Sequence, residues 1–101
     1  MNWKVFYSDD ARQDLRNIYV YISDTLQVPE IATGQVQRIM SVIRYLDTMP
    51  LRYPVYRNEP WHSQGIRVAP VDNYLIFYLP EEEGHVINIL RIMYSGRDIK
   101  E

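Results

Sequence analysis

Apolar residues follow helical spacing in the first half of the chain and strand-like runs in the second half. In residues 11–26 they recur every three or four positions, which puts them on one face of a helix: Ala11, Leu15, Ile18, Ile22 and Leu26. Residues 30–46 repeat this spacing with Ala32, Val36, Ile39, Ile43 and Leu46. The pattern therefore predicts two amphipathic helices that form a hairpin.

Both predicted helices carry start signals. Ser8 precedes two aspartates, so its hydroxyl can cap free N–H groups while the carboxylates lie at the positive end of the helix dipole. Pro29 suits the first position of the second helix, because its missing N–H is not needed there. The first helix is thus predicted to begin after Ser8 and the second near Pro29.

The remaining apolar runs are typical of strands. Four runs of this kind occur, at residues 3–7, 66–70, 74–79 and 85–94. Turn residues at 71–73 and 80–84 separate the last three, which predicts an antiparallel meander. The last run is apolar on both faces, as expected of a central strand. Residues 50–63 lack a period and are predicted to form an irregular surface loop. The predicted fold is α+β, in the order β-α-α-β-β-β, an antiparallel sheet with the two-helix hairpin packed on one face.

The composition of the chain limits the classes of function that it could have. The 101 residues are expected to form one domain, 1–101, and the net charge of −2 leaves no excess of cations for general nucleic-acid binding. Without cysteine, neither a disulfide nor a thiolate metal site can form, and no metal or cofactor is expected. No apolar stretch approaches the ~20 residues of a membrane helix, and no signal peptide is visible, so we expect a cytoplasmic protein without membrane contact.

The clearest functional signal lies near the end of the chain. The run NYLIFY at 73–78, followed by LRIMYSGRD at 90–98, resembles the C-terminal half of the RelE/ParE toxin superfamily. The likeness continues through Ser8, Ala11 and Ile18 in the first predicted helix and Ile39 and Ile43 in the second. The resemblance implies a toxin of a bacterial type II toxin–antitoxin module. It also implies a cognate antitoxin that binds the toxin in a hetero-oligomer.

The superfamily contains two activities on one fold. RelE-like members cut mRNA on the ribosome by phosphoryl transfer from a ribose 2′-hydroxyl, which needs a proton-transferring group and cations at the phosphate. If this chain were such a nuclease, its catalytic residues would be Arg67 and Arg97 at the phosphate, with His62 or Tyr94 moving the proton. However, Leu75 stands where a catalytic arginine would be expected.

The missing cations favour the ParE-like branch, whose members inhibit DNA gyrase by protein contact. The resemblance then assigns target contact to Arg91, Tyr94 and Arg97. For the antitoxin, the wide apolar stripe of the two helices is the expected docking face, with Tyr19, Tyr21 and Tyr45 as anchors.

Structural interpretations stand beside these assignments. Arg67 could lie on a solvated sheet face, Arg97 could pair with Asp98, and Tyr94 and His62 could pack without taking part in function. A non-toxic interaction domain on the same fold is a third interpretation, which the low pI keeps open.

Overall fold

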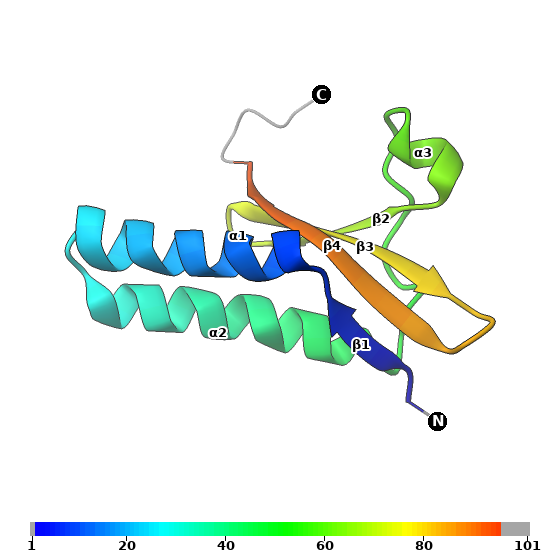
Figure 1. The fold of residues 1–101 in the computed structure, drawn as a ribbon, viewed down its shortest axis with the longest axis horizontal. Coiled ribbons are helices and arrows are strands. Elements are labelled where there is room, and N and C mark those ends of the chain that lie inside the picture. Colours follow the sequence, from blue (N-terminus) through cyan, green and yellow to red (C-terminus); the bar gives the residue numbers. More distant parts are fainter. Residues whose placement is uncertain (1, 96–101) are drawn as a thin grey trace.

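The computed structural model describes residues 2–95 (Figure 1). Its elements follow one another as β1 (Lys4–Tyr7), α1 (Asp9–Val20), η1 (Tyr21–Thr25), α2 (Pro29–Tyr45), α3 (Trp61–Gln64), β2 (Arg67–Val71), β3 (Tyr74–Glu81) and β4 (Val86–Tyr94). The predicted α+β class and the order of the strands and the two long helices are confirmed. None of the described helices is long and apolar enough to cross a membrane.

The helical hairpin forms as the spacing predicts. The Ala11 N–H donates to Ser8 Oγ at 2.9 Å, and Asp9 and Asp10 occupy the first turn of α1. The helix then widens into the single π-helical turn η1, and α2 starts at Pro29. Leu26, expected on the buried face, is 51% exposed because it lies beyond the last turn of η1.

The sheet has the order β1-β4-β3-β2, so β4 is central, as predicted. The prediction of an antiparallel sheet is correct for β2, β3 and β4, but β1 pairs with β4 in parallel, with Lys4 opposite Val86. Two strands joined directly by a tight turn must run antiparallel, whereas strands joined by a long connection need not. The helices and the other two strands lie between β1 and β4 in the chain, so no tight turn joins this pair and its direction is free of that constraint.

The turn between β2 and β3 is fastened to α2. Asp72 adopts a φ of 56°, in the left-handed region that aspartate tolerates in tight turns. Its carboxylate accepts hydrogen bonds from Gln35 Nε2 at 2.9 Å and from Arg38 Nε at 2.7 Å. These bonds hold the second helix over the far end of the hairpin.

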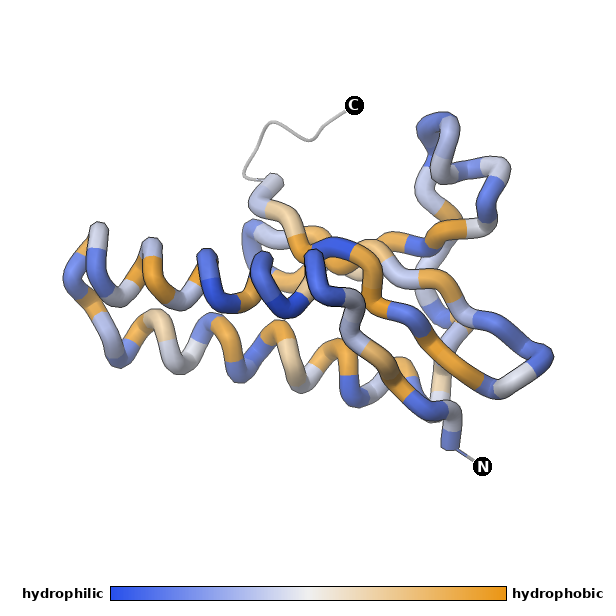
Figure 2. The backbone as a smooth tube through the Cα atoms, viewed as in Figure 1, coloured by the Kyte–Doolittle hydropathy of each residue, from blue (hydrophilic) through white to orange (hydrophobic). Residues whose placement is uncertain are grey.

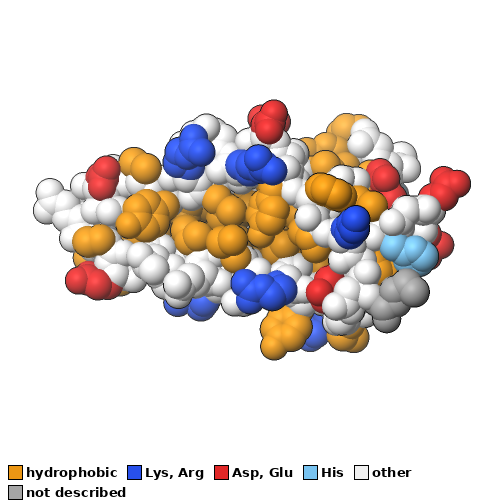
Figure 3. Space-filling model, turned by 60° about the horizontal axis from the view of Figure 1, so that its bottom comes forward, with side chains coloured by type: hydrophobic (Ala, Val, Ile, Leu, Met, Phe, Trp, Pro, Cys, Tyr) orange, Lys and Arg blue, Asp and Glu red, His pale blue; other side chains and the backbone are white. Residues whose placement is uncertain are grey.

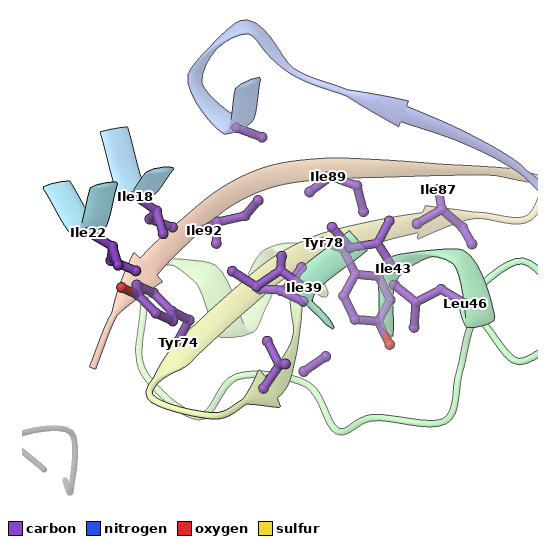
Figure 4. Close-up of a cluster of buried hydrophobic side chains, with 14 of the residues drawn as sticks. Ile18, Ile22, Ile39, Ile43, Leu46, Tyr74, Tyr78, Ile87, Ile89 and Ile92 are labelled. Carbon is purple, nitrogen blue, oxygen red and sulfur yellow. The ribbon is translucent and has the colours of Figure 1, made fainter. Parts of the chain in front are cut away.

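The core lies between the helices and the sheet. Its largest fully buried side chains come from both layers: Tyr78, Ile39, Ile43, Leu46, Ile76, Ile87 and Ile89. Figure 4 shows Ile39 and Ile43 of α2 facing Tyr78 of the sheet. Burial of each is worth about 1.5–3 kcal/mol. Figure 2 shows hydrophobic positions recurring along both helices and through β4, whereas the turn between β3 and β4 is hydrophilic. The apolar faces of the two helices and of the sheet thus pack against each other in one buried layer.

The segment 50–63 is more ordered than the predicted irregular loop. Helix α3 begins within it and Val55 forms a bridge to Arg67 of β2, so the prediction is wrong for these parts. Gly65, with a φ of 78°, ends α3 in the left-handed conformation. Glu59 accepts hydrogen bonds from the N–H and the hydroxyl of Ser63. A single helical turn is too short to show a hydrophobic period, which is why the sequence pattern missed it.

Candidate functional site

Arg67 lies on the sheet face that packs against the helices. Its register partner is the buried Tyr78, and Ala69, also buried, shares its face. The guanidinium Nη1 donates to the Tyr53 carbonyl at 2.6 Å and, at the limit of a hydrogen bond, to the Leu51 carbonyl at 3.5 Å. Beside it the Tyr78 hydroxyl donates to the Pro50 carbonyl at 3.0 Å. Arg67 therefore fastens the 50–56 segment to the end of the sheet.

His62 lies on the opposite, open face of the sheet. Its neighbour Trp61 packs on Phe77 with ring centroids 4.6 Å apart, and Tyr56 meets the same Phe77 ring at 5.1 Å. The imidazole is exposed, and its Nδ1 lies 2.9 Å from the Tyr56 carbonyl oxygen. Because Phe77 and Tyr78 are consecutive strand residues, they point to opposite faces. The structure consequently separates His62 from Arg67 by the thickness of the sheet.

Arg91 joins β4 to α1. Its guanidinium makes a two-pronged contact with Asp14, with Nε to Oδ2 at 2.8 Å and Nη2 to Oδ1 at 3.0 Å. The N–H of Ile92 donates to the same Oδ2 at 2.9 Å. Hydrogen bonding to Asp14 raises the pKa of Arg91 above its ordinary value. Paired in this way, Arg91 has a structural role whatever else it contacts.

Tyr94 is exposed, with 68% of the residue accessible to solvent. It stands at the end of β4, its ring 5.5 Å from that of Tyr74. Burial is the main cause of the raised pKa of Tyr74, with smaller contributions from Tyr94 and Tyr21. Arg97 falls outside the described residues.

A groove of about 670 Å³ begins at Tyr94 and extends to the tip of the helical hairpin. We call it the strand-end groove; its lining residues are Asn17, Ile18, Tyr21, Ile22, Leu26, Val28, Ile31, Gln35, Asn73, Tyr74 and Tyr94. No charged residue is among them. A groove of this kind suits an apolar protein segment and offers nothing to neutralise a phosphate.

The three tyrosines predicted as antitoxin anchors are all exposed, but they lie on different surfaces. Tyr21 lines the strand-end groove. Tyr45 lines a separate hollow with Asn2 and Thr48, beside the last turn of α2. Tyr19 lies one helical turn after the half-buried Leu15 on α1.

The seam between the two helices forms a further apolar surface. Figure 3 shows hydrophobic side chains gathered along the helical pair, with basic side chains on both sides of them and acidic side chains among these. Half-buried Leu15 and Val36 pack against the core, and each is followed one turn later by an exposed side chain, Tyr19 or Met40. We call this surface the helical seam. The spacing of apolar residues did not single out the basic residues beside it, although Arg12 lies three residues before Leu15.

Comparison with known proteins places these features in a family. The family described as "ParE toxin of type II toxin-antitoxin system, parDE" matches residues 5–99. No curated protein sequence matches the chain.

Solved structures share the fold at low sequence identity. A chain of the chromosomal ParDE toxin–antitoxin system from P. aeruginosa superimposes with a TM-score of 0.75 at 24% identity, covering 92% of this chain and 96% of the other. A chain of the RelBE2 toxin–antitoxin complex from Mycobacterium tuberculosis gives 0.65 at 21%, covering 94% and 100%. A chain of the archaeal RelE–RelB complex from Pyrococcus horikoshii OT3 gives 0.64 at 18%, covering 96% and 99%. Together with the family match, the fold and the C-terminal motif assign this chain to the ParE toxin family of type II toxin–antitoxin systems.

Proposed function

We propose that this toxin is ParE-like in action, arresting growth by inhibiting DNA gyrase through protein contact. The observation that carries the proposal is the dispersal of the residues that a nuclease would need. Arg67 is bound to loop carbonyls on one face of the sheet, and His62 lies on the other face. Tyr94 borders a groove whose lining carries no charge. Phosphoryl transfer needs a proton-transferring group and cations at one phosphate, and the described residues offer no such cluster.

The end of β4 is the proposed contact surface for gyrase. Tyr94 combines a large exposed ring with a hydroxyl, the type of side chain that dominates protein interfaces. Arg91 is about 39% exposed at its side chain, so its outer edge remains accessible although Asp14 holds it. Arg97 completes the proposed set. The toxin would act in the cytoplasm, where its target works.

A cognate antitoxin is the proposed second partner, forming a hetero-oligomer with the toxin. Support comes from the ParDE and RelBE neighbours, which are toxin–antitoxin assemblies. Tyr19, Tyr21 and Tyr45 are the candidate anchors. One straight helix cannot reach all three, because they lie on separate surfaces, so either the antitoxin wraps round the helical pair or only some of these tyrosines are used.

The experiment that tests the target is a short induction of the chain without any antitoxin. Incorporation of labelled thymidine and labelled methionine is followed side by side, and primer extension is run on abundant mRNAs. We expect DNA synthesis to stop first and the mRNAs to remain uncut. Codon-positioned cuts with early loss of translation would instead establish the RelE-like ribosome-dependent endonuclease. Unimpaired growth would leave the non-toxic interaction domain.

A further inference from the structure

The end of β4 contains a β-bulge, an extra residue that changes the face on which the following side chains lie. Tyr78 of β3 pairs with Ile89 of β4. The preceding residue, Phe77, pairs with Arg91, so Leu90 is an extra residue between the two pairs. A residue inserted into one strand of an antiparallel pair bends that strand and moves the side chains after it to the opposite face. Bulges of this kind are frequent beside functional sites, where they redirect a side chain.

Burial shows the change of face directly. Before the bulge the odd-numbered Ile87 and Ile89 are completely buried, whereas after it the buried residue is the even-numbered Ile92. Tyr94 lies on the same face as Ile92, opposite Tyr74 in the register, with 5.5 Å between the two tyrosine ring centroids. Without the extra residue, alternation would turn Tyr94 to the open face of the sheet, away from Tyr74. The bulge therefore brings the proposed contact residue to the strand-end groove.

Helix α1 and its cap hold the bulge in place. The Ser8 hydroxyl donates to the carbonyl of Leu90, the extra residue, at 2.9 Å. The Asp14 carboxylate accepts from the next two residues, through Nε of Arg91 at 2.8 Å and the N–H of Ile92 at 2.9 Å. Only 12% of the Asp14 side chain is exposed, and a hydrogen bond that is shielded from water is stronger than one in water. The bulge and the two residues after it are thus bound from α1 and its cap.

We infer that Asp14 is a positioning residue for the proposed gyrase contact, because it holds the bulge at Leu90 and so fixes the face on which Tyr94 is presented. The inference rests on the proposed function. Asp14 itself is largely covered and acts through its bonds to Arg91 and Ile92. A strand end that is already held in its binding geometry loses less conformational entropy on association than one that the partner must order. Loss of Asp14 should therefore weaken inhibition even in a toxin that stays folded.

Two readouts test the inference, one of function and one of orientation. The first is the concentration of toxin that halves supercoiling by purified gyrase, and the second is the set of nuclear Overhauser contacts between the rings of Tyr74 and Tyr94. Asp14→Ala removes every bond from this side chain to β4, whereas Asp14→Asn retains an acceptor oxygen for the Ile92 N–H. Arg67→Met is the matched control, since it removes an arginine hydrogen bond from β2, which β3 separates from β4. Circular dichroism melts set a temperature at which every variant is folded.

We expect Asp14→Ala to raise the half-inhibiting concentration about tenfold and Asp14→Asn about threefold, because a loosely held contact residue binds poorly. Arg67→Met should stay within about twofold of wild type, because it leaves the bulge untouched. The ring contacts should disappear in Asp14→Ala and persist in the control. In a Tyr94→Ala background, Asp14→Asn should add less than about twofold, because the side chain through which it acts is absent. General destabilisation would instead add its full effect in both backgrounds.

Either of two functional results would overturn the inference: full inhibition by folded Asp14→Ala, or an equal loss of inhibition in Arg67→Met. Persistence of the ring contacts between Tyr74 and Tyr94 in Asp14→Ala would overturn it as well. If Asp14→Ala does not fold, Asp14→Asn gives the same decision at its smaller expected effect. A wild-type toxin that leaves gyrase active would refute the proposed function, and the ring contacts would then still decide whether Asp14 holds the strand end.

Discussion

The arginines of the sheet and those of the helical seam have opposite uses in this molecule. Arg67 and Arg91 project from strands and find acceptors within the chain, a carbonyl in one case and the Asp14 carboxylate in the other. Arg12, Arg16 and Arg44 stand on helices and find none among the described residues. The difference teaches that a cation's residue type says little about its role. The acceptors around it decide whether it serves the fold or remains available to a partner.

The strongest test of this contrast removes Asp14. Asp14→Ala leaves the Arg91 guanidinium and the Ile92 N–H without their acceptor. Because hydrogen bonds to charged groups contribute about 1.5–3 kcal/mol, we expect the free energy of unfolding to fall by about 2–3 kcal/mol in urea denaturation. Asp14→Asn keeps an acceptor oxygen and should lose less. A variant as stable as the wild type would mean that the β4–α1 contact is incidental.

Arg67→Met should produce the next largest effect. The substitution keeps an unbranched apolar side chain and removes the donor to the Tyr53 carbonyl, so we expect a loss of about 1–2 kcal/mol. Growth arrest per folded molecule should be unchanged, because the account gives Arg67 no role at the target. Loss of toxicity with unchanged stability would instead indicate that Arg67 is a catalytic residue.

Lowering the pH tests the ion pair of a third arginine, Arg38, by protonating its partner Asp72. Hydrogen bonds from Arg38 and then Gln35 hold the pKa of Asp72 below its ordinary value. Its stabilisation is therefore complete above the unfolded pKa of about 3.9 and is lost as the pH falls through the lower folded pKa. The side chain is 42% exposed, so solvent screening limits the effect to about 0.5 kcal/mol. Asp72→Asn, which suits the left-handed turn, should flatten that part of the stability–pH curve; an unchanged curve would contradict the assignment.

The smallest effect is expected on the helices. Replacing both Arg12 and Arg16 by Gln removes cations without internal partners, so the free energy of unfolding should change by less than about 0.5 kcal/mol. Thermal melts followed by circular dichroism measure it. A loss of unfolding free energy as large as that of Arg67→Met would mean that the arginines of the helices stabilise the fold as much as those of the sheet.

Local signals predicted the elements well. Helical spacing located α1 and α2, Ser8 located the cap, and apolar residues on both faces marked β4 as central. These features depend on neighbours within a few positions in the chain, which a single sequence displays directly.

Features that depend on distant contacts escaped prediction. The parallel pairing of β1 with β4 and the packing of Trp61 on Phe77 join segments far apart in the chain. The same is true of the site: Arg91 was predicted to contact a target, but its bond to Asp14 spans 77 positions and has no periodic signature. Arg67 was expected at a phosphate or on a solvated sheet face, and no local pattern shows that the carbonyls of Leu51 and Tyr53 lie beside it.

A supercoiling reaction with purified gyrase shows whether this toxin acts by binding a protein. The relaxed-plasmid supercoiling reaction is run with the wild-type chain, with Tyr94→Ala, and with the wild-type chain after addition of the antitoxin. We expect the wild-type chain to block supercoiling, Tyr94→Ala to block it less, and the antitoxin to restore it. Undiminished supercoiling at a large molar excess of folded toxin would contradict the account.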